Sequence, residues 1–188
     1  MGASITDDGW AFADRSLTSA EVIVALYRTI REAAGTSLLI GCNTVGHLAA
    51  GLVEIQRIGD DVSSRSWGRI PRMGLNALAF RAAQHGTFFA VDADVAPLAR
   101  SLPWDGARQW LQLVAASGTP LFVSLDQDMR DPEVLAHLRD AVATASSPRP
   151  VAEPMDWMDT VWPTRWMIDG RERTFDWMDP TGGHPFGD

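Results

Sequence analysis

Short apolar runs alternate with amphipathic helical segments along the chain, and this alternation limits the fold more than any other feature. The runs that we expect to form strands are 38–42, 53–58, 87–91 and 121–125. The segments that we expect to form helices are 18–35, 70–83, 103–117 and 131–146. Strands that alternate with helices form a parallel sheet with helices packed on it. The sequence therefore predicts the α/β class, and its four strands are half the number in an eight-stranded (β/α) barrel.

Local signals define the ends of the first and last helices. Thr18 and Glu21 form a capping box, in which each side chain satisfies a free backbone N–H of the other residue. Gly35 supplies a C-terminal stop for this helix. Asp131, followed by a proline, caps the last helix. The run 38–42 is apolar without alternation, which predicts a strand covered on both faces.

A change of composition divides the chain into 1–147 and 148–188. The sequence Ser-Ser-Pro-Arg-Pro at 146–150 has the character of a linker, and four of the eight tryptophans follow it. Within this second segment, Asp169-Gly170 separates two strand-like runs, and its tolerance of positive φ favours a type I′ hairpin. We therefore predict a β-rich unit after the α/β part.

Composition and charge exclude several classes of function. The chain has 188 residues, 46% of them hydrophobic, and a net charge of −8, so it lacks the positive surface that nucleic acid requires. It has no apolar run long enough to cross a membrane and no signal-peptide pattern at its start, so we expect a soluble, cytoplasmic protein. All 16 basic residues are arginine, which excludes Schiff-base chemistry and the lysine of a phosphate-binding loop.

Aspartates follow three successive predicted strands in pairs. The pairs are Asp60 and Asp61, Asp92 and Asp94, and Asp126 and Asp128. Because parallel strands end on one side of a sheet, we expect all six carboxylates to converge on one rim. Crowded carboxylates cannot all ionise easily, so one can stay protonated and act as a general acid. Alternatively, these aspartates only start turns and cap helices.

Three further residues accompany this rim. Arg57 precedes Asp61 by four residues and can bind substrate hydroxyls or hold a carboxylate ionised. Cys42 ends a strand on the same side and is either a small buried filler or a substrate contact. Trp67 is either a stacking platform for a sugar or part of the core.

The motifs along these strands resemble retaining α-galactosidases of the melibiase kind. The sequences L-I-G-C at 39–42 and R-I-G-D-D-V at 57–62 are similar to the ends of the fifth and sixth barrel strands of that family. The sequence D-A-D at 92–94 is similar to the D-P-D that closes the seventh strand, and F-V-S-L-D at 122–126 to the eighth strand. The resemblance implies a partial barrel of about strands 5 to 8, followed by the start of a C-terminal β-rich unit.

The resemblance also implies roles for individual residues. Asp61 corresponds to the general acid/base and Arg57 to a sugar contact, with Cys42 close to the sugar hydroxyls. Asp92 and Asp94 would contact the substrate, an α-linked galactoside, and Trp67 is a further candidate contact. Asp60 stands where the family has proline, so a shifted register would make Asp60 the acid.

The family's nucleophile, an aspartate after the fourth strand, has no counterpart in this sequence. We therefore expect no activity from the chain alone, no metal or other cofactor, and either a homo-oligomer or a complementing chain that covers the open sheet edges. Two alternatives stay open. One is a non-catalytic or vestigial carbohydrate-binding protein, and the other is a metal-dependent hydrolase that uses the Asp-x-Asp pairs at 92 and 126 as ligands for Mg²⁺ or Ca²⁺.

Overall fold

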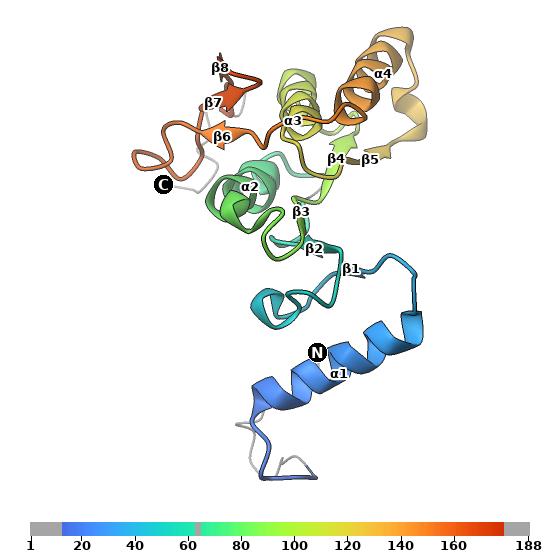
Figure 1. Cartoon of the computed structure of the whole chain (residues 1–188). Coiled ribbons are helices and arrows are strands. Elements are labelled where there is room, and N and C mark those ends of the chain that lie inside the picture. Colours follow the sequence, from blue (N-terminus) through green and yellow to red (C-terminus); the bar gives the residue numbers. More distant parts are fainter. Residues whose placement is uncertain (1–12, 63–64, 179–188) are drawn as a thin grey trace.

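A computed structural model describes residues 13–62 and 65–178 and shows a mixed α/β architecture (Figure 1). The helices are α1 (Ser19–Ala34), α2 (Asn76–Arg81), α3 (Trp104–Ala116) and α4 (Pro132–Ala145). The strands are β1 (Ile40–Gly41), β2 (Ile55–Arg57), β3 (Ala90–Asp92), β4 (Val95–Leu98), β5 (Phe122–Leu125), β6 (Glu153–Pro154), β7 (Arg165–Ile168) and β8 (Arg171–Thr174). No helix among these residues is long and apolar enough to cross a membrane.

The first five strands pair in parallel and in chain order. One sheet has the order β1-β2-β3, and a second sheet pairs β4 with β5. The break between the two sheets lies at Asp94, whose φ of 73° turns the chain out of β3 before β4 begins. These parallel sheets confirm the predicted α/β class. β4 was not among the expected strands, because no element was assigned between the run 87–91 and the helix expected from 103.

The helices lie close to their expected positions, with one difference. The capping box of Thr18 and Glu21 is formed at the start of α1, and Asp131 caps α4 by accepting a hydrogen bond from the backbone N–H of Val134. The single helix expected over 70–83 is instead a π-helix at Ile70–Leu75, then α2, then a 3₁₀ turn at Ala82–Gln84. Ile70, Leu75, Leu78 and Ala79 of this segment are buried in the core, whereas Phe80 is exposed.

The C-terminal hairpin packs into the same core as α3. The turn between β7 and β8 has positive φ at both Asp169 and Gly170, as the sequence predicted for a type I′ turn. Trp166 of β7 and Trp177 beyond β8 are buried in one hydrophobic cluster with Trp110 of α3. The division of the chain at 147 and 148 stays a prediction.

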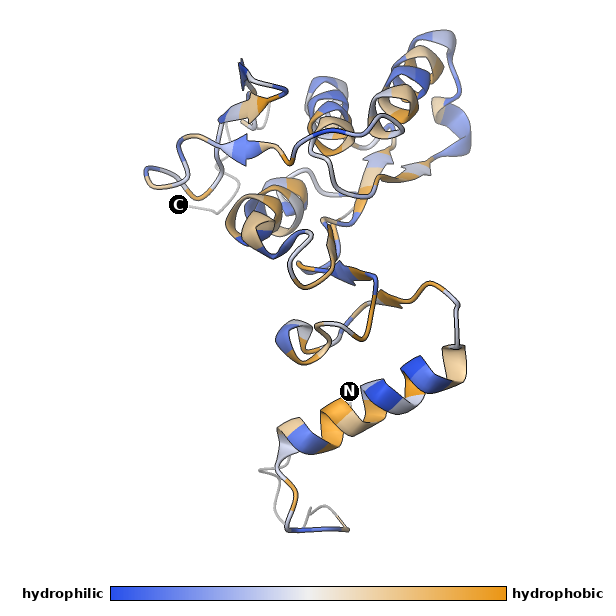
Figure 2. Ribbon diagram, in the orientation of Figure 1, coloured by the Kyte–Doolittle hydropathy of each residue, from blue (hydrophilic) through white to orange (hydrophobic). Residues whose placement is uncertain are grey.

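The expectation that 38–42 is covered on both faces is wrong. The side chain of Leu38 is 61% exposed and that of Ile40 is 47% exposed. No residue of α1 is buried, and the helix lies at the far end of the molecule from α3 and α4 (Figures 1 and 2). Leu26 at 56% and Ile30 at 46% exposure are largely open to solvent, although α1 contacts the 3₁₀ turn at Gly46–Leu48.

The core around Trp67 gives a first test. A Cβ atom on Gly106 would lie 2.5 Å from the ring of Trp67, whereas a Cβ on Gly46 would meet its nearest neighbour, the guanidinium of Arg81, at 3.4 Å. We expect Gly106→Ala to lower the free energy of unfolding by about 1–3 kcal/mol, in spite of alanine's better helix propensity. Urea unfolding measures this, with Gly46→Ala as the control. Equal stability of the two variants would contradict the packing described here.

Candidate functional site

The guanidinium of Arg57 joins three carboxylates at the end of β2. Its Nε lies 3.0 Å from Asp92 Oδ2, its Nη2 2.9 Å from Asp94 Oδ1, and its Nη1 3.2 Å from Asp61 Oδ1. The parallel register places Arg57 opposite Asp92, so the two side chains meet because β2 and β3 end together. We call Arg57, Asp61, Asp92 and Asp94 the Arg57 cluster. The structure thus brings together four of the residues that the sequence singled out.

Asp92 and Asp94 form the buried floor of the Arg57 cluster. They are 1% and 5% exposed. Asp92 Oδ1 accepts a hydrogen bond of 2.8 Å from the backbone N–H of Asp94, and Asp94 Oδ2 accepts one of 2.7 Å from the backbone N–H of Val62. Their carboxylates are therefore fully engaged with Arg57 and with backbone donors, which ties the loop after β2 to the end of β3.

The effect of Asp92 and Asp94 on the pKa of Arg57 is larger than the opposing effect of burial. Burial has the largest single effect on the guanidinium and acts to lower its pKa. The hydrogen bond and charge of Asp92, together with the charge of Asp94, act in the opposite direction and raise the pKa of Arg57 above its ordinary value. Arg57 therefore holds its positive charge inside the cluster.

Asp60 and Asp61 are adjacent in sequence but differ in environment. Asp60 accepts a hydrogen bond from the backbone N–H of Asp61 and forms an ion pair with Arg69. These contacts hold the pKa of Asp60 below its ordinary value. The side chain of Asp61 is 78% exposed and contacts Arg57. Both side chains are open to solvent, since that of Asp60 is 67% exposed, and what separates them is their partner: Asp61 pairs with Arg57 inside the cluster, whereas Asp60 pairs with Arg69.

Arg69 is a residue that the sequence analysis did not single out. Its guanidinium also donates to the backbone carbonyl of Asp61, at 2.9 Å from Nε and 2.6 Å from Nη2. It therefore fixes the backbone on which both Asp60 and Asp61 stand. No sequence signal indicates this role, because the contact depends on how the loop between β2 and the π-helix folds back.

Cys42 follows β1 and is exposed, so it is not the buried filler that the sequence left open. It is close enough to Arg57 to contribute to the raised pKa of that guanidinium. Cys42 also lines a small cavity of about 140 Å³ with Tyr27, Ile30 and Leu39. The thiol thus lies between the Arg57 cluster and the open end of the sheet.

Trp67 belongs to the core. It is 4% exposed, packs on Gly106 of α3, and donates from its indole N–H to the backbone carbonyl of Trp177 at 3.1 Å. The sequence left two interpretations of Trp67 open, a stacking platform for a sugar and a core residue, and the structure places it in the core. The ring has little surface left on which a sugar could stack.

The convergence of all six aspartates on one rim is wrong. Asp94 stands immediately before β4, whereas Asp126 follows β5 and donates its backbone N–H to the carbonyl of Leu98 at the far end of β4. The four paired residues of β4 separate the two positions by about 13 Å. Asp126 and Asp128 begin a 3₁₀ turn, and Asp128 contacts Arg100. The physical reason is the turn at Asp94, which starts a second sheet instead of continuing the first.

The donor set of the Arg57 cluster suits an arginine better than a metal ion. Across 13–62 and 65–178, no group of three or more His, Cys, Asp and Glu side chains is placed to hold a metal. Asp92 and Asp94, which the metal-dependent alternative requires as ligands, both pair with Arg57. The findings give that alternative no support.

Comparison with known proteins supports a distant likeness in fold. No family model and no curated protein matches the chain. Among solved structures, an alpha-galactosidase from Thermus thermophilus, determined in complex with p-nitrophenyl alpha-D-galactopyranoside, matches with a TM-score of 0.54 and 22% identity. The match covers 80% of this chain and 32% of that chain, so this chain spans about a third of its length. The fold resembles part of a glycoside hydrolase.

The ion pairs of the cluster predict unequal effects of two matched substitutions. Asp92→Asn removes the charge of a buried carboxylate and leaves the partly buried Arg57 without its partner on β3, and we expect the free energy of unfolding to fall by about 3 kcal/mol or more. Asp61→Asn alters an exposed carboxylate, and we expect stability close to that of the parent chain. Urea unfolding at pH 7 compares them. Similar losses for both variants would show that the buried pair is not the dominant contact.

Proposed function

We propose that the Arg57 cluster is the acid/base half of a glycoside hydrolase site of the α-galactosidase type, with Asp61 as the proton-transferring residue. The observation that carries this proposal is the placement of one exposed carboxylate, Asp61, on a guanidinium that two buried carboxylates hold in position. The likeness in fold to an alpha-galactosidase supports the same assignment. Asp60 is the weaker candidate, because it pairs with Arg69 and the backbone N–H of Asp61 and has no contact with Arg57 among the described ion pairs.

In this proposal Arg57 both positions Asp61 and contacts the substrate. The contacts with the three aspartates occupy three of the five N–H groups of a guanidinium. The other N–H groups, on Nη1 and Nη2, donate to hydroxyl oxygens of an α-linked galactoside. Cys42 borders the same sugar from the end of β1. Asp92 and Asp94 act through Arg57 and do not themselves reach the substrate, because both are buried.

The proposed site binds a galactoside but does not turn it over. Retaining hydrolysis needs a second carboxylate about 5 Å from the acid/base to attack the anomeric carbon. Asp92 and Asp94 are the nearest carboxylates of the Arg57 cluster, and each is held by Arg57 and by a backbone donor. The nucleophile therefore has to come from outside this cluster, and the chain alone acts as a carbohydrate-binding half-site.

A hydrolysis and binding experiment tests this proposal. We expect the purified chain to release no p-nitrophenol from p-nitrophenyl α-galactoside above the buffer rate, and Asp61→Asn to behave the same way. Ligand-observed NMR with methyl α-D-galactopyranoside should detect weak binding that Asp61→Asn reduces, with Asp105→Asn, a change at an exposed aspartate of α3, as the control. If the parent chain hydrolyses the substrate and Asp61→Asn abolishes this activity, the proposal that the chain is only a binding half-site is wrong. Binding unaffected by Asp61→Asn would contradict the assignment of the site.

We propose further that a second copy of this chain covers α1 and β1. Ile30 of α1 lines the open cavity next to β1, Leu26 is exposed one turn earlier on the same helix, and the outer edge of β1 carries no described strand. An open strand edge with an apolar flank favours pairing with another chain. A two-fold axis through this edge would pair β1 with its copy and bring the two α1 stripes together.

Light scattering tests this pairing. We expect a particle of twice the 20.5 kDa mass of the chain at micromolar concentration. The double substitution Leu26→Glu and Ile30→Glu should yield a monomer, because it places charges on the proposed contact. Val142→Glu, at a residue of α4 that is 50% exposed, is the matched control and should leave the dimer intact. A parent chain that is monomeric under these conditions would refute the pairing.

A further inference from the structure

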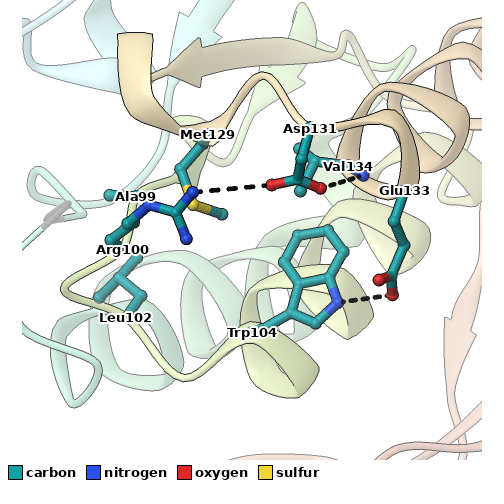
Figure 3. A pocket seen from close by; sticks show the side chains of 8 residues that line it. All are labelled: Ala99, Arg100, Leu102, Trp104, Met129, Asp131, Glu133 and Val134. Carbon is teal, nitrogen blue, oxygen red and sulfur yellow. Dashed lines mark hydrogen bonds and ion pairs between the residues drawn. The ribbon is translucent and has the colours of Figure 1, made fainter.

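A second pocket opens where β4 and β5 end. Its cavity of about 320 Å³ lies between the first turns of α3 and α4 (Figure 3). The residues that shape it are Arg100, Leu102, Trp104, Met129, Asp131 and Glu133. Asp94 of the Arg57 cluster stands before β4 and this pocket lies beyond its other end, so the two places are separate. The carboxyl ends of parallel strands are where α/β folds bind ligands.

The polar side chains of this pocket come from the first turns of α3 and α4, and hydrogen bonds fix their positions. The indole N–H of Trp104 donates to Glu133 Oε1 at 3.2 Å, so the ring and the carboxylate fix each other across the pocket. Asp131 uses Oδ1 to cap α4 and turns Oδ2 toward Arg100, 3.9 Å from Nη2. Arg100 also donates to the backbone carbonyl of Asp128 at 2.6 Å. The pocket therefore offers fixed donors and acceptors beside an aromatic ring.

The charges of the lining residues restrict the ligand. Asp131 and Glu133 repel an anion, and the charge of Arg100 is largely balanced by its pairs with Asp128 and Asp131. A neutral ligand with hydroxyl groups avoids this repulsion, since its hydroxyls donate to carboxylates and accept from a guanidinium. Leu102 and Met129 add apolar surface that suits the C–H groups of such a ligand.

We propose that this pocket binds the ring of a neutral pyranose, stacked on Trp104 with its hydroxyls directed to Glu133, Asp131 and Arg100. The cavity is at the small end of ligand sites, which suits a single sugar ring. This inference does not rest on the function proposed for the Arg57 cluster. The pocket would be a second sugar-binding site, separated from the Arg57 cluster by about the length of β4.

Saturation-transfer NMR tests the pocket with methyl α-D-glucopyranoside and methyl α-D-galactopyranoside as probes. We expect transfer to at least one of them, and a Kd raised about tenfold by Trp104→Leu, the loss of about 1.4 kcal/mol that one stacked ring supplies. Arg100→Gln should raise the Kd several-fold. This second variant keeps the test valid if Trp104→Leu does not fold, because the side chain of Arg100 is 61% exposed.

Two control variants separate this pocket from the rest of the molecule. Trp157→Leu removes a tryptophan that is 47% exposed elsewhere, and Asp61→Asn disables the Arg57 cluster. We expect a sugar-binding component that neither control changes. No transfer to either probe would overturn the proposal, and so would binding by the Asp61→Asn chain that an added Arg100→Gln leaves undiminished. Tetramethylammonium bound in a Trp104-dependent way, without any sugar, would overturn it in favour of a cation site.

Discussion

The ion pairs of Arg57 with Asp92 and Asp94 are the interaction on which the polar end of the first sheet depends. A buried carboxylate costs several kcal/mol unless a charged partner and hydrogen bonds satisfy it. Here the partner comes from the neighbouring strand, and the hydrogen bonds come from the backbone of Asp94 and Val62. One guanidinium thereby joins β2, β3 and the loop between them, and the turn at Asp94 that starts the second sheet is built on the same contacts.

This interaction also separates the carboxylates by role. The sequence suggested that crowding of like charges would force one aspartate to keep its proton, but Arg57 and Arg69 supply positive charge to the group. Asp60 is held ionised, Asp92 and Asp94 are buried, and Asp61 reaches solvent. The chemistry that the site can perform follows from exposure and partners, and not from the number of carboxylates.

The two ends of the molecule differ in how completely they are covered. Around α3, helix, sheet and hairpin share one core with Trp110 and Trp166 at its centre, and the pocket beside Trp104 is shaped by this rigid part. At α1 and β1, apolar residues such as Leu26 and Ile40 are about half exposed, and Figure 2 shows hydrophobic stretches of ribbon in this part of the molecule. Among the described residues no strand pairs with the outer edge of β1, so this edge and the apolar side chains near it are exposed together.

Features that depend on hydrogen bonds within a few residues could be predicted from the sequence alone. The capping box of α1, the Asp131 cap of α4 and the turn at Asp169-Gly170 are of this kind, and the apolar runs located β2 and β5. The sequence placed Arg57 near the expected carboxylates, but its pairing with Asp92 came from the register of β2 and β3. Only the tertiary structure decided that Trp67 is core, that Ile40 is exposed, that Arg69 holds Asp60, and that Asp126 lies far from Asp94. Those outcomes depend on which distant segments pack together, and burial and long-range ion pairs leave no periodic signal in the chain.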